Sequence, residues 1–104
     1  MNPLRKAKVM FKDDFAGIIE ETGQGYCFTY DAKYIEQGKP MAVAFPIQKQ
    51  PYESKMLFPF FKGLLPEGWY RDIVCRTLKI DSKDEFGLLI KACGNCIGAV
   101  WIKE

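Results

Sequence analysis

Two cysteines separated by two residues, Cys93 and Cys96, are the first candidates for chemistry in this sequence. Such a pair can form a redox-active disulfide or supply half of a tetrahedral zinc site. A structural zinc site usually needs a second pair, but Cys27 and Cys75 are far apart in the sequence. The pair also ends a predicted helix, where the helix dipole disfavours a thiolate, whereas redox motifs of this kind open a helix. Packing is therefore the preferred interpretation, and a small redox protein stays as an alternative.

The other groups that catalysis commonly uses are scarce. The sequence has no histidine, which removes the usual general base and the commonest metal ligand. The segment Asp84–Gly87 resembles a kinase Asp-Phe-Gly motif with one residue inserted, but its context predicts the start of an amphipathic helix. The carboxylate pairs Asp13–Asp14 and Glu20–Glu21 fall in a turn and at a strand end, where such pairs are usually solvated. We therefore expect a protein that is not an enzyme and binds no cofactor or metal.

The most informative segment is Phe58–Trp69, which we call the elbow. It gathers three phenylalanines, two leucines and a tryptophan around two prolines and two glycines. Proline and glycine interrupt the interior of a helix, and a plain surface loop seldom exposes so much apolar area. The elbow is therefore predicted either to cap the core or to present aromatic groups to a partner. Trp69, at one margin of the next helix's apolar stripe, is either a core aromatic or an interface anchor.

Length and composition predict one domain that spans residues 1–104. The chain is 48% hydrophobic and 14% aromatic, which is typical of a folded globule. Its net charge is +2, and Arg5, Lys6 and Lys8 form the only local basic cluster, so direct nucleic-acid binding is not expected. No apolar run approaches the roughly 20 residues of a membrane span, and the N-terminus lacks a signal-peptide core. We expect no membrane association and a cytoplasmic location.

Strands dominate the first half of the predicted structure. Alternating apolar residues predict strands over Lys6–Lys12, Phe15–Glu20 and Tyr26–Asp31, which form an antiparallel meander with a bulge at Gly17. The basic cluster is interpreted as a solvated strand edge. Three further elements are predicted before the elbow: a helical turn at Asp31–Gly38, a buried strand at Met41–Ile47 and a polar loop at Gln48–Lys55.

Two helices and a last strand follow. Pro66 is placed at the first position of a helix that runs to about Lys79. Its apolar stripe consists of Tyr70, Ile73, Val74 and Leu78, with Cys75 off the stripe and partly exposed. A capping box at Ser82–Glu85 begins the second helix, whose stripe is Phe86, Leu89, Ile90 and Cys93, and Gly94 ends it. A strand over Cys96–Lys103 completes an α+β fold, a small mainly antiparallel sheet with two helices packed on one side.

Several motifs resemble the N-terminal subdomain of the HipA-type serine/threonine kinase toxins. The central ones are Phe60-Phe61, Leu64–Gly68 with Arg71, Phe86–Leu89 and Gly94–Val100; upstream, Phe28, Tyr30, Tyr34, Gly38, Ala44–Ile47 and Tyr52 also fit. The resemblance covers nearly the whole chain in the right order. One departure is Asn95, where the family often has aspartate.

The resemblance implies a stand-alone, HipS-like antitoxin of a split HipBST-type toxin–antitoxin system. Its expected partner is a HipT-like or HipA-like kinase toxin, with a HipB-like helix-turn-helix protein as a further candidate in a ternary complex. We expect the docking surface to include Phe61, Leu65, Glu67, Trp69 and Tyr70, with Trp69 inserting toward the kinase cleft. The alternative is a truncated N-terminal piece of an ordinary HipA-type kinase with no function of its own.

Overall fold

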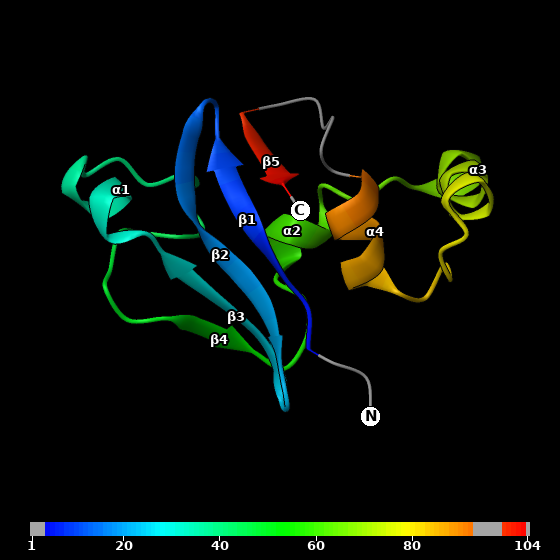
Figure 1. Cartoon of the computed structure of the whole chain (residues 1–104), viewed down its shortest axis with the longest axis horizontal. Coiled ribbons are helices and arrows are strands. Elements are labelled where there is room, and N and C mark those ends of the chain that lie inside the picture. Colours follow the sequence, from blue (N-terminus) through cyan, green and yellow to red (C-terminus); the bar gives the residue numbers. More distant parts are fainter. Residues whose placement is uncertain (1–3, 93–98, 104) are drawn as a thin grey trace.

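The computed structural model of the 104-residue chain describes residues 4–92 and 99–103. Within these residues, five strands form one antiparallel sheet in the order β4-β3-β2-β1-β5, accompanied by four helices (Figure 1). The strands are β1 (Lys6–Phe11), β2 (Asp14–Thr22), β3 (Gly25–Tyr30), β4 (Tyr52–Ser54) and β5 (Val100–Lys103). The helices are α1 (Ala32–Glu36), α2 (Pro59–Lys62), α3 (Gly68–Leu78) and α4 (Glu85–Ala92). The predicted α+β class with a small antiparallel sheet is confirmed.

The meander β1-β2-β3 and its bulge are also confirmed. The pairing of β1 with β2 shifts after Val9, which pairs with Gly17, whereas Met10 pairs with Phe15. Ala16 is therefore the extra residue of a bulge in β2. A Cβ atom on Gly17 would lie 2.2 Å from the carbonyl oxygen of Thr29 in β3. Only glycine permits this close approach of the two backbones.

The core lies on one face of the sheet, covered by α2 and α4. The strand residues that face it include Val9, Ile19, Phe28 and Ile102, each 1% exposed or less. From α2, Phe61 packs on Phe28 with ring centroids 5.9 Å apart. From α4, the buried side chains are Phe86, Leu88 and Leu89. Helix α3 lies beyond α4, away from the sheet (Figure 1).

The first part of the elbow caps this core. Phe58, Phe61 and Leu65 are buried, and Phe45 packs edge-to-face on Phe58 with ring centroids 5.3 Å apart. Pro59 is tolerated because it opens the short helix α2, and Gly63 ends that helix. In this part of the elbow, Phe58, Phe61 and Leu65 fill the core, while Pro59 and Gly63 bound a four-residue helix.

Four local predictions need correction. Met41–Ile47 is not a strand: Ala42 and Phe45 pair across a tight turn whose tip, Val43, is 98% exposed. Gln48–Lys55 is not all loop, because it contains β4, which pairs with β3. Helix α3 begins at Gly68 rather than Pro66. Ser82 does not cap α4; instead, the backbone N–H of Gly87 donates to Oδ1 of Asp84 at 3.1 Å. The predicted ends at Gly94 and the segment 96–98 of the last strand lie outside the described residues.

Two stacked tyrosines, Tyr30 and Tyr34, differ in their hydrogen bonds and so allow the contribution of buried hydrogen bonds to stability to be measured. The Tyr30 hydroxyl donates to the carbonyl oxygen of Phe45 and accepts from the backbone N–H of Met41 at 3.2 Å. Tyr30→Phe should therefore lower the free energy of unfolding by about 1–3 kcal/mol, because two buried backbone groups lose their partner. Urea denaturation measures this loss. The matched control is Tyr34→Phe, since the buried Tyr34 hydroxyl has no hydrogen-bond partner among the described residues; we expect almost no loss there. Equal losses in both variants would contradict this explanation.

Candidate docking surface

Three of the four residues in the apolar stripe of helix α3 are exposed, while the fourth, Val74, packs against the core. Tyr70 is 57% exposed, Leu78 is 44% exposed and Ile73 is 42% exposed, whereas Cys75 is buried. The expectation that Cys75 is partly exposed is therefore wrong, while most of the apolar stripe is open to solvent. The physical reason is that α3 packs against α4 and not against the sheet.

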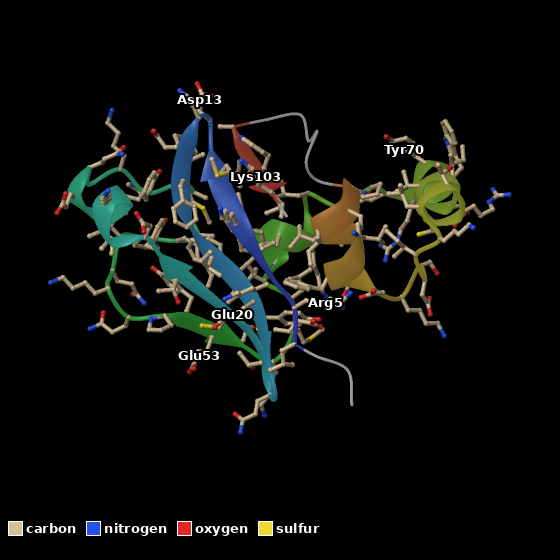
Figure 2. All side chains as sticks on the ribbon, viewed as in Figure 1. Arg5, Asp13, Glu20, Glu53, Tyr70 and Lys103 are labelled. Atoms are coloured by element: carbon tan, nitrogen blue, oxygen red, sulfur yellow. The ribbon has the colours of Figure 1, made fainter. Side chains whose placement is uncertain are left out.

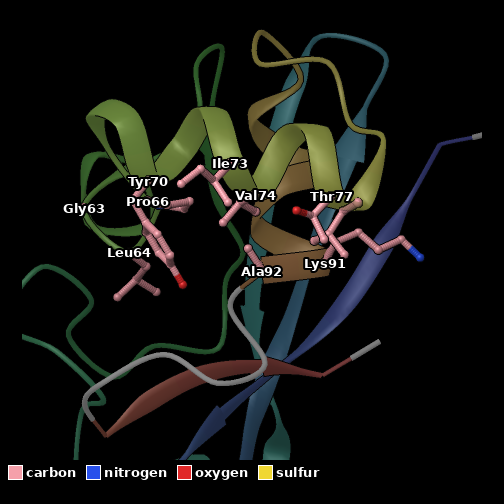
Figure 3. Close-up of a pocket in the computed structure, with 10 residues that line it drawn as sticks. Gly63, Leu64, Pro66, Tyr70, Ile73, Val74, Thr77, Lys91 and Ala92 are labelled. Atoms are coloured by element: carbon pink, nitrogen blue, oxygen red, sulfur yellow. The ribbon is translucent and has the colours of Figure 1, made fainter.

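The open stripe forms one wall of a groove. The groove has a volume of about 710 Å³ and lies between α3, the end of α4 and the segment that follows α2. Figure 3 shows Tyr70, Ile73 and Val74 pointing from α3 into this space. Leu64 and Ala92 line the groove from the other elements. The arrangement is a concave, mainly apolar surface on a helix that projects from the body of the molecule (Figures 1 and 2).

The structure divides the five residues predicted for the docking surface into two groups. Phe61 and Leu65 are 0% and 6% exposed, so they lie in the core. Glu67, Trp69 and Tyr70 are exposed around the start of α3. Trp69 is 74% exposed, and its ring meets that of Tyr70 edge-on, with centroids 6.3 Å apart. The elbow therefore both caps the core, through its first part, and presents aromatic groups, at its end.

Sequence reasoning missed three residues of this surface. Ile73 and Leu78 extend the exposed apolar area from Trp69 and Tyr70 along α3, and the half-buried Val74 lines the groove beside them. The sequence identified all three as part of the apolar stripe but did not place them on the docking surface. Helical periodicity identifies the apolar face of a helix but does not say what that face meets. A contiguous exposed patch of this kind is typical of an interaction site.

The orientation of α3 depends on its short connections. Glu67 lies in an extended conformation at the N-cap, and Gly68 has a φ of +60°, which turns the chain sharply into the helix. At the other end, Lys79 adopts the left-handed conformation and the backbone N–H of Ile80 donates to the Cys75 carbonyl oxygen at 2.9 Å. The Arg71 guanidinium donates to the carbonyl oxygen of Ser82, just before α4. These contacts hold the stripe in place relative to α4.

An ion-pair network anchors α4 in turn. Arg5 Nε lies 2.7 Å from Glu21 Oε1, and Arg5 Nη2 lies 2.8 Å from Asp84 Oδ1 (Arg5 is labelled in Figure 2). Hydrogen bonds from the Arg5 guanidinium lower the pKa of both carboxyl groups. A Cβ atom on Gly87 would lie 2.3 Å from Asp84 Oδ2, so glycine leaves room for this network. Arg5, expected on a solvated strand edge, instead connects β2 to the start of α4.

This network predicts a dependence of stability on pH. The folded-state pKa of Glu21 and of Asp84 is below its ordinary value, so the stabilisation is present at neutral pH and is lost as pH falls below about 4.5. Arg5→Gln should cost about 1 kcal/mol at pH 7, a small value because the groups are partly exposed. The free energy of unfolding of the variant should also fall less than that of wild type between about pH 5 and pH 3, because its carboxyl groups no longer have the arginine partner. Urea unfolding across this range, with Lys8→Gln as the control, measures both effects. Parallel pH curves for Arg5→Gln and wild type would contradict the prediction.

The cysteines and acidic residues are the candidates for other kinds of site. Cys27 and Cys75 are buried free thiols, while Cys93 and Cys96 lie outside the described residues. Over residues 4–92 and 99–103, no three His, Cys, Asp or Glu side chains are grouped so that they could hold a metal ion. In the same part of the chain, no helix has the length and apolar character that crossing a membrane requires.

Comparisons with known proteins place this architecture in a family. A solved structure described as the N-terminal domain of HipA toxin matches with a TM-score of 0.74 and 34% identity, over 100% of this chain and 97% of that one. An uncharacterized protein of Haemophilus influenzae is 38% identical over 101 residues, which are 97% of this chain and 93% of the relative. The putative kinase Y4mE of Sinorhizobium fredii is 29% identical over 75 residues, 70% of this chain but 18% of the kinase. The HipA N-terminal domain family model matches residues 7–103, and the chain belongs to this family.

Proposed function

We propose that this chain is a non-enzymatic antitoxin that acts in the cytoplasm. It binds a HipT-like or HipA-like serine/threonine kinase toxin and neutralises it by docking at or near the active-site cleft. The observation that carries the proposal is the uncovered stripe of α3, with Trp69 74% exposed at its start. A domain with a well-filled aromatic core has no structural need for that stripe on its surface, so the stripe indicates a partner.

The relatives support a partner of the kinase class. In Y4mE the matching region is 18% of a protein named as a putative kinase, so a domain of this kind occurs joined to a much longer chain. The Haemophilus influenzae relative is matched over 93% of its own length, so the domain also occurs in a protein of about this size. A surface that packs on a kinase within one chain can dock on a kinase as a separate chain. The degree of inhibition then depends on the affinity of this contact and on the amounts of the two proteins.

Trp69 is the proposed anchor of this contact. Tryptophan and tyrosine are enriched among the residues that dominate binding energy, and Trp69 and Tyr70 are adjacent and exposed here. Glu67 lies beside them at the helix start. Phe61 and Leu65 act indirectly in this proposal, because they fix the elbow from inside the core. A HipB-like helix-turn-helix protein is a further candidate partner in a ternary complex.

Co-expression tests the proposal directly. The chain is expressed together with a HipT-like or HipA-like kinase from the same genome, and growth, co-purification and kinase autophosphorylation are measured. We expect the chain to restore growth, to co-purify with the kinase and to reduce phosphorylation. If the kinase remains toxic and does not co-purify, the antitoxin proposal fails and the interpretation as a fragment without its own function is favoured.

A further inference from the structure

The face of the sheet that points away from the core carries an apolar cluster of its own. We call it the back-face cluster, and its members are Met10, Phe15, Ile18 and Trp101. Met10 pairs with Phe15 in β2 and with Trp101 in β5, so these three side chains form one row across three strands. All four residues are partly exposed, and none of them belongs to the partly buried residues that pack against the core. The apolar surface of the domain is therefore not limited to α3 and its groove.

Trp101 is held in a fixed position within this cluster. Its indole Nε1 donates to the carbonyl oxygen of Lys12 at 2.7 Å, in the turn that joins β1 to β2. This hydrogen bond ties the ring on β5 to the hairpin beside it. An aromatic group that is already held in place loses little conformational entropy on binding, which is a property of good interface anchors.

Two lysines without a counter-charge border the cluster. Lys8 of β1 and Lys103 of β5 lie directly opposite each other on this face, and both are exposed. Like charges in directly opposite positions destabilise a sheet. On its other side Lys8 faces Ile18, and neither lysine forms an ion pair within residues 4–92 and 99–103. A carboxylate supplied from outside the domain would relieve this repulsion.

We propose that the back-face cluster and these two lysines form a second docking surface, and that its partner is an acidic protein segment with large apolar side chains. Carboxylate groups of the segment lie over Lys8 and Lys103, while its apolar side chains pack on Met10 and Trp101. Complementary charges of this kind decide which partner binds and in which orientation. The apolar row adds the contact area that a purely ionic contact lacks.

The charges of the same face favour a protein segment over a nucleic acid. Nucleic-acid binding needs a basic patch or stripe. In the next row of this face, Lys6 lies opposite Glu20, and Glu53 follows in β4. Figure 2 shows Glu20 and Glu53 toward the opposite end of the sheet from Lys103. The positive charge is therefore confined to one lysine pair, and a chain of phosphates that continued along the face would meet carboxylates.

This surface is separate from the one proposed for the kinase. The back-face cluster lies on β1, β2 and β5, whereas the apolar stripe of α3 lies beyond α4, away from the sheet (Figure 1). The two surfaces share no residue, so one chain can hold two partners at once. The inference therefore goes beyond the proposed function and does not depend on it.

Trp101 gives a direct readout of binding at this face. The chain has two tryptophans, so Trp69→Phe leaves Trp101 as the sole tryptophan. Two synthetic peptides without tryptophan are titrated into the full-length variant, and tryptophan fluorescence is recorded. Both consist of aspartate, leucine and phenylalanine, one with strict alternation of acidic and apolar residues and one with the apolar residues at helical spacing. We expect a saturable change in Trp101 emission with at least one of them.

Charge reversal tests the role of the lysines. In the same background, Lys8→Glu combined with Lys103→Glu should weaken binding of the acidic peptide by about tenfold or more. The reversed protein should instead bind a peptide in which lysine replaces every aspartate. The matched control is Lys33→Glu combined with Lys39→Glu, which changes the net charge equally at two exposed positions outside the sheet. It should bind the acidic peptide as the unreversed protein does.

Three results would overturn the proposal. They are no response of Trp101 to either acidic peptide, equal affinities before and after reversal of the lysines, and a response to a duplex DNA oligonucleotide in place of the peptides. A change in Trp101 emission on simple dilution of the chain would instead identify a second copy as the occupant, and would overturn it as well. Kinase affinity is measured separately on wild type and on the lysine reversal, and both should bind the kinase equally. A chain that binds the kinase without a Trp101 response contradicts only this inference, and the opposite result contradicts only the antitoxin assignment.

Discussion

Trp69→Ala should weaken binding to the kinase by roughly 30-fold to 700-fold and abolish growth rescue. Truncating an anchor residue typically costs ~2–4 kcal/mol of binding free energy, and each 1.4 kcal/mol is about tenfold in the dissociation constant. Trp69 is 74% exposed in the free chain, so its removal leaves no cavity, and unfolding should change by no more than about 0.5 kcal/mol. Calorimetric titration of a catalytically inactive kinase measures the affinity, and urea denaturation measures the stability.

The matched control is Val43→Ala, which also removes an exposed apolar side chain. Val43 is 98% exposed at the tip of the turn between Ala42 and Phe45, in the segment that joins α1 to β4. It should bind the kinase as wild type does and restore growth. A kinase affinity of Trp69→Ala equal to that of wild type would show that the docking surface lies elsewhere. A large stability loss in Trp69→Ala would instead show that the tryptophan belongs to the packing of the fold.

The elements that could be predicted from the sequence are those whose signal is local. Strict alternation in β1 and β3, and the bulge beside Gly17, follow from residue types within a few positions. The strand prediction for Met41–Ile47 was wrong because a short apolar run does not show whether its backbone is extended or forms a turn. There, two buried side chains, Met41 and Phe45, belong to a turn whose tip is solvent-exposed. β4 was not predicted because its three residues, Tyr52–Ser54, are too few to show an alternating pattern. Their pairing with β3 is what makes them a strand.

The site was predictable only in part, because exposure depends on distant contacts. The sequence drew attention to Trp69, at the end of the elbow, and to Tyr70 beside it, and both are exposed in the structure. Composition could not divide the elbow into a buried part and an exposed part, since Phe61 and Trp69 are equally apolar. The division is set by α2, which lies over the sheet, and by α3, which contacts α4 instead. Arg5 shows the same limit, because its carboxylate partners are 16 and 79 residues away in the sequence.

Phe61→Ala should destabilise the fold by about 3–5 kcal/mol, the range typical of a buried phenylalanine truncated to alanine. Phe61 is 0% exposed and its ring contacts those of Phe28, Phe45 and Phe58, with centroids 5.9, 5.5 and 6.0 Å away. Removing it leaves a cavity that several rigid rings cannot close by small movements. Small domains have total stabilities of roughly 5–15 kcal/mol, so a substantial share would be lost. Urea denaturation at neutral pH measures the loss.

Phe60→Ala is the matched control, because the neighbouring ring is only partly buried. Its loss should be clearly smaller, and a loss equal to that of Phe61→Ala would contradict the core assignment. Kinase affinity then separates the two roles of the elbow. Once corrected for the unfolded fraction, the affinity of Phe61→Ala should match wild type, whereas that of Trp69→Ala should not. If folded Phe61→Ala still bound the kinase poorly, the capping part of the elbow would have to open on binding, and the division between a buried part and a docking part would hold only for the free chain.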